Sequence, residues 1–231
     1  MDPDLLALLR GADTATVCNA IEMVQGRRGF SAFTRGTMIC SAPDEPPIVG
    51  FAVTARIAAR APSTEPPDVV RARRMAYYRA MHDGPKPSVA VVEDLDFPDC
   101  IGAYWGEINT TIHKGFGMAG ALTNGVVRDL GDLPRGFPVV AGSVGPSHGF
   151  VHVRSLGERV TVLGLEIAQG DLVHADRHGA LVVPPDVVAG LDDGIRRLRE
   201  TERLVLDPAR APGFDFAAFE RAWAAFEKAR T

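Results

Sequence analysis

The chain has 231 residues, a formal net charge of −4 and a hydrophobic fraction of 46%. This length fits one large domain or two small ones, and the apolar content suffices for a substantial core. The mild acidity and the lack of a dense Lys/Arg run argue against nucleic acid as the main partner. No apolar run reaches membrane-spanning length, and the three widely spaced cysteines form neither a disulfide framework nor a zinc motif. We therefore expect a cytoplasmic protein with reduced thiols and no membrane partner.

The N-terminal half alternates helical and strand-like segments. Capping residues and glycine stops predict helices over 5–10 and 15–24, a proline-free run predicts a strand over 48–59, a further helix is expected over 69–82, and a short buried strand over 89–92. Asp94, Asp96 and Asp99 follow that strand. They could form a metal site, but their spacing is not that of an EF-hand, which favours a solvated loop with capping carboxylates.

The central stretch, residues 105–132, carries the strongest signal for chemistry. A helix is predicted to begin at Gly106, and a strand is predicted over 119–123. An Asn124-Gly125 turn then leads to the charged pair Arg128-Asp129. In open α/β sheets, ligands bind outside the carboxyl ends of strands. This pair is therefore the first candidate for a functional site.

The C-terminal half is rich in short strands and ends in helices. Strands are predicted at 138–141, at 151–153 paired with 159–162, and as a hairpin over 172–176 and 180–183; helices are predicted from 186 to about 204 and over 214–228. No linker or internal repeat divides the chain. We expect a single α/β domain over 1–231, of which 205–231 form a C-terminal helical extension.

The charged pair has a chemical interpretation and a plain one. Arg128 can bind a carboxylate or carbonyl oxygen through its planar guanidinium. Asp129 can hold Mg²⁺, which often keeps most of its waters and uses one or two protein carboxylates. The alternative is that both are ordinary surface charges after a strand.

The residues before the central helix offer a second candidate. If Gly106-Glu107-Ile108-Asn109 opens a helix, its free backbone N–H groups form an anion site. Gly106 would let a ligand approach the backbone closely. Glu107 could reach the same pocket, or could simply complement the helix dipole.

The remaining reactive side chains narrow the chemistry. The three lysines, Lys86, Lys114 and Lys228, are not placed for a desolvated Schiff base. A carbon–carbon lyase of this sequence would therefore need a metal as electron sink. The pairs His148/His152 and His174/His178 have a zinc-like spacing, but the surrounding sequence does not favour the helix on which that spacing works. The four arginines within 71–79 are interpreted as a solvated helix face.

Several of these segments together resemble the family of metal-dependent 4-hydroxy-4-methyl-2-oxoglutarate aldolases and the regulator of ribonuclease activity A (RraA). The central motif is Trp105-Gly106-Glu107, twenty residues, then Arg128-Asp129. Residues 49–59 look like the family's early G-x-A-x-T strand, and GDLVHADRHGALVVP at 170–184 is similar to its late hairpin. The likeness extends over about residues 12–205.

The resemblance implies a β/β/α sandwich with mixed sheets and flanking helices, assembled as a homotrimer or hexamer. It implies a metal-dependent aldolase that cleaves a 4-hydroxy-2-oxo acid to pyruvate and also decarboxylates oxaloacetate. Asp129 would hold Mg²⁺ or Mn²⁺, Arg128 would bind and stabilise the pyruvate enolate, and the backbone from Gly106 through Glu107 and Ile108 to Asn109 would bind the substrate carboxylate.

The resemblance also leaves an alternative, a non-catalytic regulator that binds a ribonuclease or RNA helicase. Glu107 stands where the aldolases carry an aspartate, and the regulators lack a carboxylate there. Glu107 therefore favours the enzyme, as a third catalytic residue beside Arg128 and Asp129.

Overall fold

The computed structural model describes residues 1–230, which form two compact units. The first consists of Met1–Thr14 and Ser31–Pro185, and the second of Ala15–Phe30 together with the chain from Asp186 onwards. The extension expected to begin at residue 205 starts inside a helix, α5 (Leu191–Arg210). Among the described helices, none has both the length and the apolar character needed to span a bilayer.

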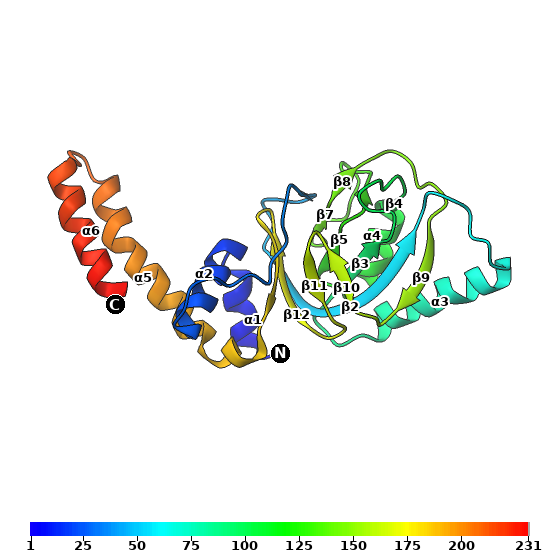
Figure 1. Ribbon diagram of the computed structural model, residues 1–231, viewed down its shortest axis with the longest axis horizontal. Coiled ribbons are helices and arrows are strands. Elements are labelled where there is room, and N and C mark those ends of the chain that lie inside the picture. Colours follow the sequence, from blue (N-terminus) through cyan, green and yellow to red (C-terminus); the bar gives the residue numbers. More distant parts are fainter. Residues whose placement is uncertain (231) are drawn as a thin grey trace. The chain divides into compact units, whose positions relative to one another are not determined.

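The first unit is built on a mixed eight-stranded sheet (Figure 1). Four parallel strands form its centre in the order β7 (Val139–Ala141), β5 (Gly120–Thr123), β3 (Ser88–Asp94) and β2 (Ile48–Ala58). Antiparallel strands complete it, with β1 (Ile39–Cys40) beside β7, β12 (Leu172–Asp176) and β9 (His152–Leu156) beside β2, and β13 (Gly179–Val183) beside β12. Its central strands are nearly continuous apolar runs because both faces are covered. The expected α/β class with mixed sheets and flanking helices is confirmed.

A small parallel sheet carries the candidate site. It consists of β4 (Ala103–Trp105), β6 (Val126–Val127) and β8 (Ser143–Val144). The charged pair directly follows β6, a two-residue strand that was not predicted from the sequence. The predicted strand, β5, ends at Thr123, and four residues lie between it and the pair.

One predicted strand pairing was wrong. The strand at 151–153 corresponds to β9, which pairs with β2, whereas β10 (Val160–Val162) pairs with β11 (Leu165–Ile167). The β10–β11 hairpin turns through Leu163 and Gly164, both at positive φ (49° and 78°). Leucine rarely adopts that conformation, so the sequence carried no ordinary turn signal.

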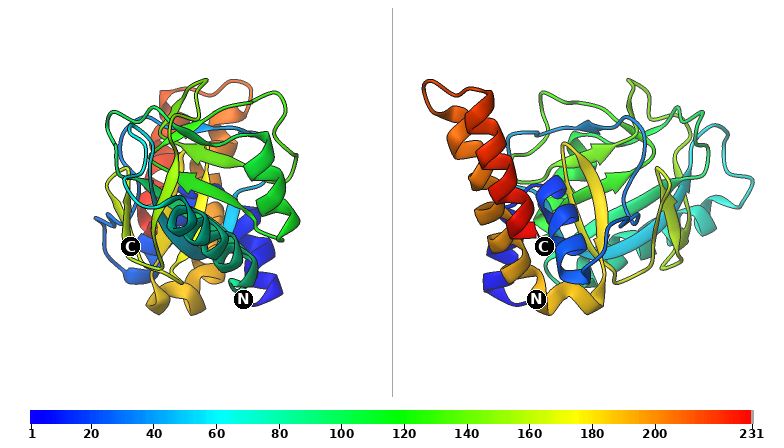
Figure 2. Two further views of the ribbon diagram at one scale, coloured as in Figure 1. Left: turned by 90° about the vertical axis from the view of Figure 1, so that its right-hand side faces the viewer. Right: turned by 60° about the vertical axis from the view of Figure 1, so that its left-hand side comes forward.

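Three helices belong to the first unit: α1 (Pro3–Arg10), α3 (Pro67–Asp83) and α4 (Glu107–Gly115). The second unit contains α5, α6 (Phe216–Arg230) and most of both α2 (Thr14–Gln25) and the 3₁₀ turn Pro185–Gly190. Helices α5 and α6 lie antiparallel and side by side (Figures 1 and 2). Gly194 permits close packing of α5 on α2, since a Cβ there would lie 2.8 Å from a Val24 methyl group.

A buried aromatic cluster fixes α4 in the first unit. Trp105 is fully buried, and its ring lies 4.9 Å from that of His113. His113 Nδ1 lies 2.6 Å from the Asn109 carbonyl oxygen, and Nε2 lies 2.6 Å from the Tyr77 hydroxyl. Since a carbonyl can only accept, Nδ1 carries the proton and Nε2 accepts from Tyr77. Burial lowers the pKa of His113 from 6.5 to about 4.

The low pKa of His113 predicts that the fold loses stability in acid. Between pH 6.5 and about 4 the unfolded chain binds a proton at His113 that the folded chain does not, so the free energy of unfolding falls as the pH is lowered through this range. The expected contribution is up to about 3 kcal/mol, since one pKa unit corresponds to about 1.4 kcal/mol. Urea unfolding across this range should show a smaller pH slope in His113→Gln than in wild type. An unchanged slope in His113→Gln would contradict the assignment.

Candidate functional site

The start of α4 is capped by a residue far away in the sequence. Gly106 is the N-cap residue and offers no side chain, so the first-turn N–H groups need other acceptors. Asp129 Oδ2 accepts a hydrogen bond from the Glu107 N–H at 3.1 Å. A carboxylate also complements the positive end of the helix dipole. The cap thereby joins the two segments that the sequence motif singled out.

The backbone after β6 directs the charged pair toward α4. The Arg128 N–H donates to the Trp105 carbonyl at 2.8 Å, which extends the pairing of β6 with β4. Asp129 then adopts φ +55°, a left-handed conformation that aspartate tolerates better than most residues. The Asp132 N–H closes the turn on the Asp129 carbonyl at 2.9 Å. The bend leaves both side chains of the pair about one-third exposed.

Glycine at position 106 permits the close approach of these groups. Arg128 Nε lies 3.5 Å from Asp129 Oδ2. A Cβ on residue 106 would lie 2.5 Å from that same oxygen and 2.9 Å from that nitrogen. The backbone of Gly106 is extended (φ −138°, ψ −173°) and needs no glycine by itself. The need for glycine comes from the two charged side chains.

The donor set at Asp129 fits a hydrated hard cation. Both contacts of its carboxylate fall on Oδ2, so Oδ1 makes none to the described residues. Across residues 1–230, no group of three or more His, Cys, Asp or Glu side chains could enclose a metal. A single partly exposed carboxylate suits a cation that keeps most of its waters.

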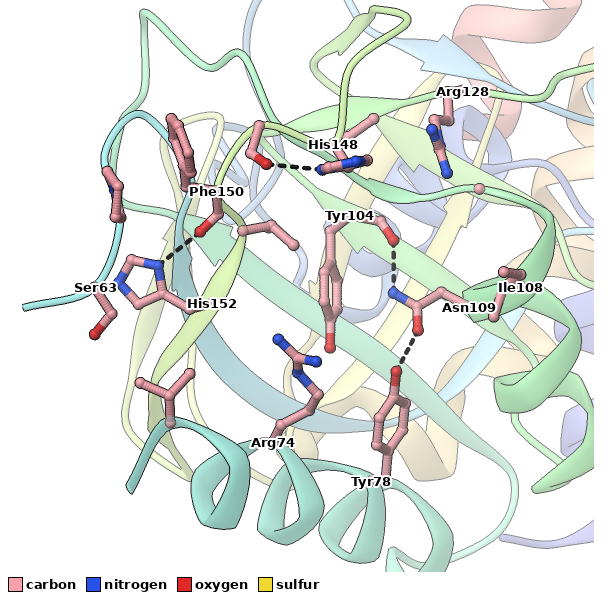
Figure 3. Close-up of a pocket in the computed structure, with 16 residues that line it drawn as sticks. Ser63, Arg74, Tyr78, Tyr104, Ile108, Asn109, Arg128, His148, Phe150 and His152 are labelled. Carbon is pink, nitrogen blue, oxygen red and sulfur yellow. Dashed lines mark hydrogen bonds between the residues drawn. The ribbon is translucent and has the colours of Figure 1, made fainter. Parts of the chain in front are cut away.

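A hollow of about 510 Å³ opens beside this pair (Figure 3). Of the five residues expected to bind substrate, Gly106, Ile108, Asn109 and Arg128 line it, whereas Glu107, like Asp129, lies next to this lining rather than in it. The Asn109 side chain braces the wall, since its Oδ1 accepts from the Tyr78 hydroxyl at 2.7 Å and its Nδ2 donates to the Tyr104 carbonyl at 2.6 Å. Asn109 therefore offers a ligand its backbone N–H rather than its amide group.

Much of the lining was not predicted from the sequence. The unexpected members are Pro62, Ser63, Val70, Arg74, Tyr78, Ala103, Tyr104, His148, Gly149, Phe150, Val151 and His152. Arg74 was interpreted as part of a solvated helix face, and the spacing of His148 and His152 as accidental. That spacing does not place them on a helix, yet the loop and β9 bring both to the same hollow.

The acidic loop after β3 uses its carboxylates as caps. Asp96 Oδ2 accepts from the N–H groups of Ala59 and Arg60 at 2.6 and 2.9 Å, and Asp94 Oδ1 accepts from the Asp96 N–H at 3.0 Å. Asp99 pairs with the Arg60 side chain. These contacts support the interpretation as a capped loop over that as a metal site.

Known proteins share sequence and fold with this chain. Over 124 residues the chain is 27% identical to Protein DlpA of Legionella pneumophila, an alignment that covers 52% of this chain and 20% of DlpA. The chain thus spans only about a fifth of that relative's length. An uncharacterized protein from Pseudomonas syringae pv. tomato has the same fold, with a TM-score of 0.68 at 20% identity over 100% of this chain and 98% of that one.

A third relative carries a functional description. Streptomyces coelicolor RraAS2, described as an unusual member of the RNase ES inhibitor RraA family, gives a TM-score of 0.65 at 20% identity over 88% of this chain and 96% of its own. At this identity the likeness shows the fold alone. The RraA-like family model (Aldolase/RraA) matches residues 14–182, which include the whole charged motif and nearly all of the late hairpin. The chain belongs to the RraA-like family, which includes both aldolases and non-catalytic ribonuclease inhibitors.

Proposed function

We propose that this protein is a divalent-metal-dependent aldolase that cleaves a 4-hydroxy-2-oxo acid, such as 4-hydroxy-4-methyl-2-oxoglutarate, to pyruvate. The observation that carries the proposal is the adjacency of Arg128, Asp129 and the start of α4 at the edge of one hollow. These groups supply a guanidinium, a cation-holding carboxylate and backbone donors within a single site.

The start of α4 suits the carboxylate of the 2-oxo acid. The N–H groups of Ile108 and Asn109 lie in the first turn and have no intrahelical acceptor. Both residues line the hollow, so an anion there would meet the positive end of the helix. Arg128 lines the same hollow and can donate to the neighbouring 2-oxo oxygen.

The bond cleavage requires stabilisation of negative charge at that oxygen. A base takes the proton of the C4 hydroxyl, whose oxygen becomes the carbonyl of the second product as the C3–C4 bond breaks. The electron pair of that bond moves into the pyruvate enolate, and the protonated base returns the proton to C3. Arg128 is placed to stabilise the enolate oxygen, where a fixed cation contributes most. A divalent cation held by Asp129, with Glu107 beside it, would supply Lewis-acid stabilisation of the same charge.

The same arrangement supports a second activity. Loss of carbon dioxide from oxaloacetate yields the same pyruvate enolate, so the groups that stabilise one product stabilise the other. Oxaloacetate decarboxylation is therefore part of the proposal.

An oligomer is also part of the proposal. Ile108 and Phe150 both line the hollow, yet 73% and 54% of their surfaces are exposed. Apolar side chains this exposed beside a site favour cover by another subunit. We propose a homotrimer or hexamer, which sedimentation equilibrium would identify.

The rival is a non-catalytic regulator that binds a ribonuclease or RNA helicase. The Streptomyces relative is described as an unusual member of a family of RNase ES inhibitors. The strongest support for a regulator is the shared fold. The Asp129 carboxylate at the start of α4, next in space to Glu107, favours the enzyme, because protein binding alone does not need a cation-holding carboxylate.

Pyruvate release decides between the two functions. Purified protein should release pyruvate from 4-hydroxy-4-methyl-2-oxoglutarate and from oxaloacetate with Mg²⁺ or Mn²⁺, and addition of EDTA should stop both reactions, as followed with lactate dehydrogenase and NADH. No release from either acid at saturating metal, together with a stable complex with a ribonuclease or helicase in a pull-down, would overturn the aldolase proposal in favour of the regulator.

A further inference from the structure

The lining of the hollow beside the charged pair contains basic side chains and no acidic ones. Its 16 lining residues include two arginines and two histidines, and none of them is an aspartate or glutamate. In a chain with a net charge of −4, this concentration of basic side chains is local. Pyruvate carries one carboxylate, which Arg128 and the start of α4 can serve by themselves. The other basic groups therefore point to a second negative charge on the ligand.

Arg74 is the strongest basic group at the other end of the hollow. It extends from α3, whereas Arg128 follows β6, and Figure 3 shows the two guanidinium groups entering the hollow from opposite sides with Tyr104 between them. Neighbouring Arg73 is bound by both oxygens of Glu65. Within the described chain, no carboxylate forms an ion pair with Arg74.

The surroundings of Arg74 provide further donors. The Tyr104 hydroxyl is buried close to the Tyr77 and Tyr78 hydroxyls, although none of the described residues meets it in good hydrogen-bonding geometry. Its position beside Arg74 in Figure 3 agrees with the effect of the Arg74 charge, which works to lower the pKa of both Tyr104 and Tyr78, although burial outweighs it. A guanidinium beside phenol hydroxyl groups forms a suitable receptor for a carboxylate.

We propose that Arg74 is a specificity-determining residue that binds the distal carboxylate of the substrate, so that the site selects 2-oxo dicarboxylates over 2-oxo monocarboxylates. This assignment rests on the proposed function for the orientation of the substrate, with its 2-oxo acid end at Arg128. A volume of about 510 Å³ is ample for an acid of five or six carbons in this orientation.

The kinetic test compares two substrates that differ at the distal end. Arg74→Gln should lower kcat/KM for 4-hydroxy-4-methyl-2-oxoglutarate by about 10- to 100-fold, mainly through KM, because a charge-assisted hydrogen bond is lost. It should change kcat/KM for 4-hydroxy-2-oxopentanoate, which lacks the distal carboxylate, by less than about twofold. Arg71→Gln, an exposed arginine of the same helix outside the hollow, should behave as wild type with both substrates.

A binding test keeps the assignment independent of turnover. Calorimetry with metal present should show tighter binding of 2-oxoglutarate than of 2-oxopentanoate by wild type, and Arg74→Gln should remove this difference while it retains binding of 2-oxopentanoate. Equal or undetectable binding of the two acids by wild type, or an equal loss of both in Arg74→Gln, would overturn the role of Arg74. If wild type discriminates between these acids but cleaves no hydroxy acid, the aldolase proposal fails and the subsite stands.

Discussion

Replacement of Asp129 with asparagine should lower pyruvate release from both substrates by about a thousandfold or more at saturating Mg²⁺, since a loss of about 4 kcal/mol of charge stabilisation corresponds to that factor. Asparagine tolerates the positive φ of this position, and its Oδ1 can still accept from the Glu107 N–H. The fold and the helix cap should therefore persist. What the substitution removes is the negative charge that would hold the cation.

Two measurements separate this result from a general loss of structure. Thermal unfolding should give nearly the wild-type Tm, and titration with Mn²⁺ followed by electron paramagnetic resonance should show weakened binding. Asp207→Asn, an exposed carboxylate on α5, is the matched control and should retain full activity. Full turnover by Asp129→Asn under metal-replete conditions would falsify the assignment of Asp129.

Gly106→Ala should lower activity by about 100-fold or more, because a displacement of about 1 Å at reacting groups can cost that much. The added methyl group would lie 2.5 Å from Asp129 Oδ2 and 2.9 Å from Arg128 Nε, so both side chains must move. The free energy of unfolding should change by only about 1 kcal/mol, or about 2–4 °C in Tm. The atoms that must move lie at the ends of partly exposed side chains, and alanine can adopt the extended backbone conformation of this position.

The same helix offers a control for Gly106→Ala. A Cβ at Gly115, the last residue of α4, meets nothing within 4 Å, so Gly115→Ala should keep both activity and Tm. The double variant Gly106→Ala/Asp129→Asn should be little worse than Asp129→Asn alone, because both changes disrupt one interaction. Full activity in Gly106→Ala, or additive losses in the double variant, would show that the two residues do not act as a unit.

The longer elements of the fold were predictable because each carries its own periodicity or boundary residues. Strand β2, the β12–β13 hairpin and the start of α4 after Gly106 all lie where the sequence placed them. The short strands β4, β6 and β8 were missed, since two or three residues show no alternation and form strands only through their partners. The partner of β9 was predicted wrongly for a related reason, as no local pattern indicates which of several strands lies alongside.

Some residues of the candidate site could be predicted from the sequence, and others could not. Gly106, Arg128 and Asp129 could be singled out because they stand in a contiguous motif, and the structure brings them together. Arg74, Tyr104 and the histidines of the hollow come from separate elements, and nothing in their local sequence distinguishes them from surface or core residues. Their proximity depends on how α3, β4 and β9 pack. That packing is a tertiary property that one sequence does not reveal.

The basic lining of the hollow has a practical consequence for anyone who handles this protein. Phosphate, sulfate and citrate are multivalent oxyanions, and a cavity with two guanidinium groups and no carboxylate in its wall would accommodate them as readily as a metabolite. Citrate would also chelate the divalent cation that the proposed function requires. Purification and assay media built on monovalent chloride and an amine buffer leave the cavity open to its own ligand, whereas crystals grown from ammonium sulfate would tend to show a sulfate ion in its place.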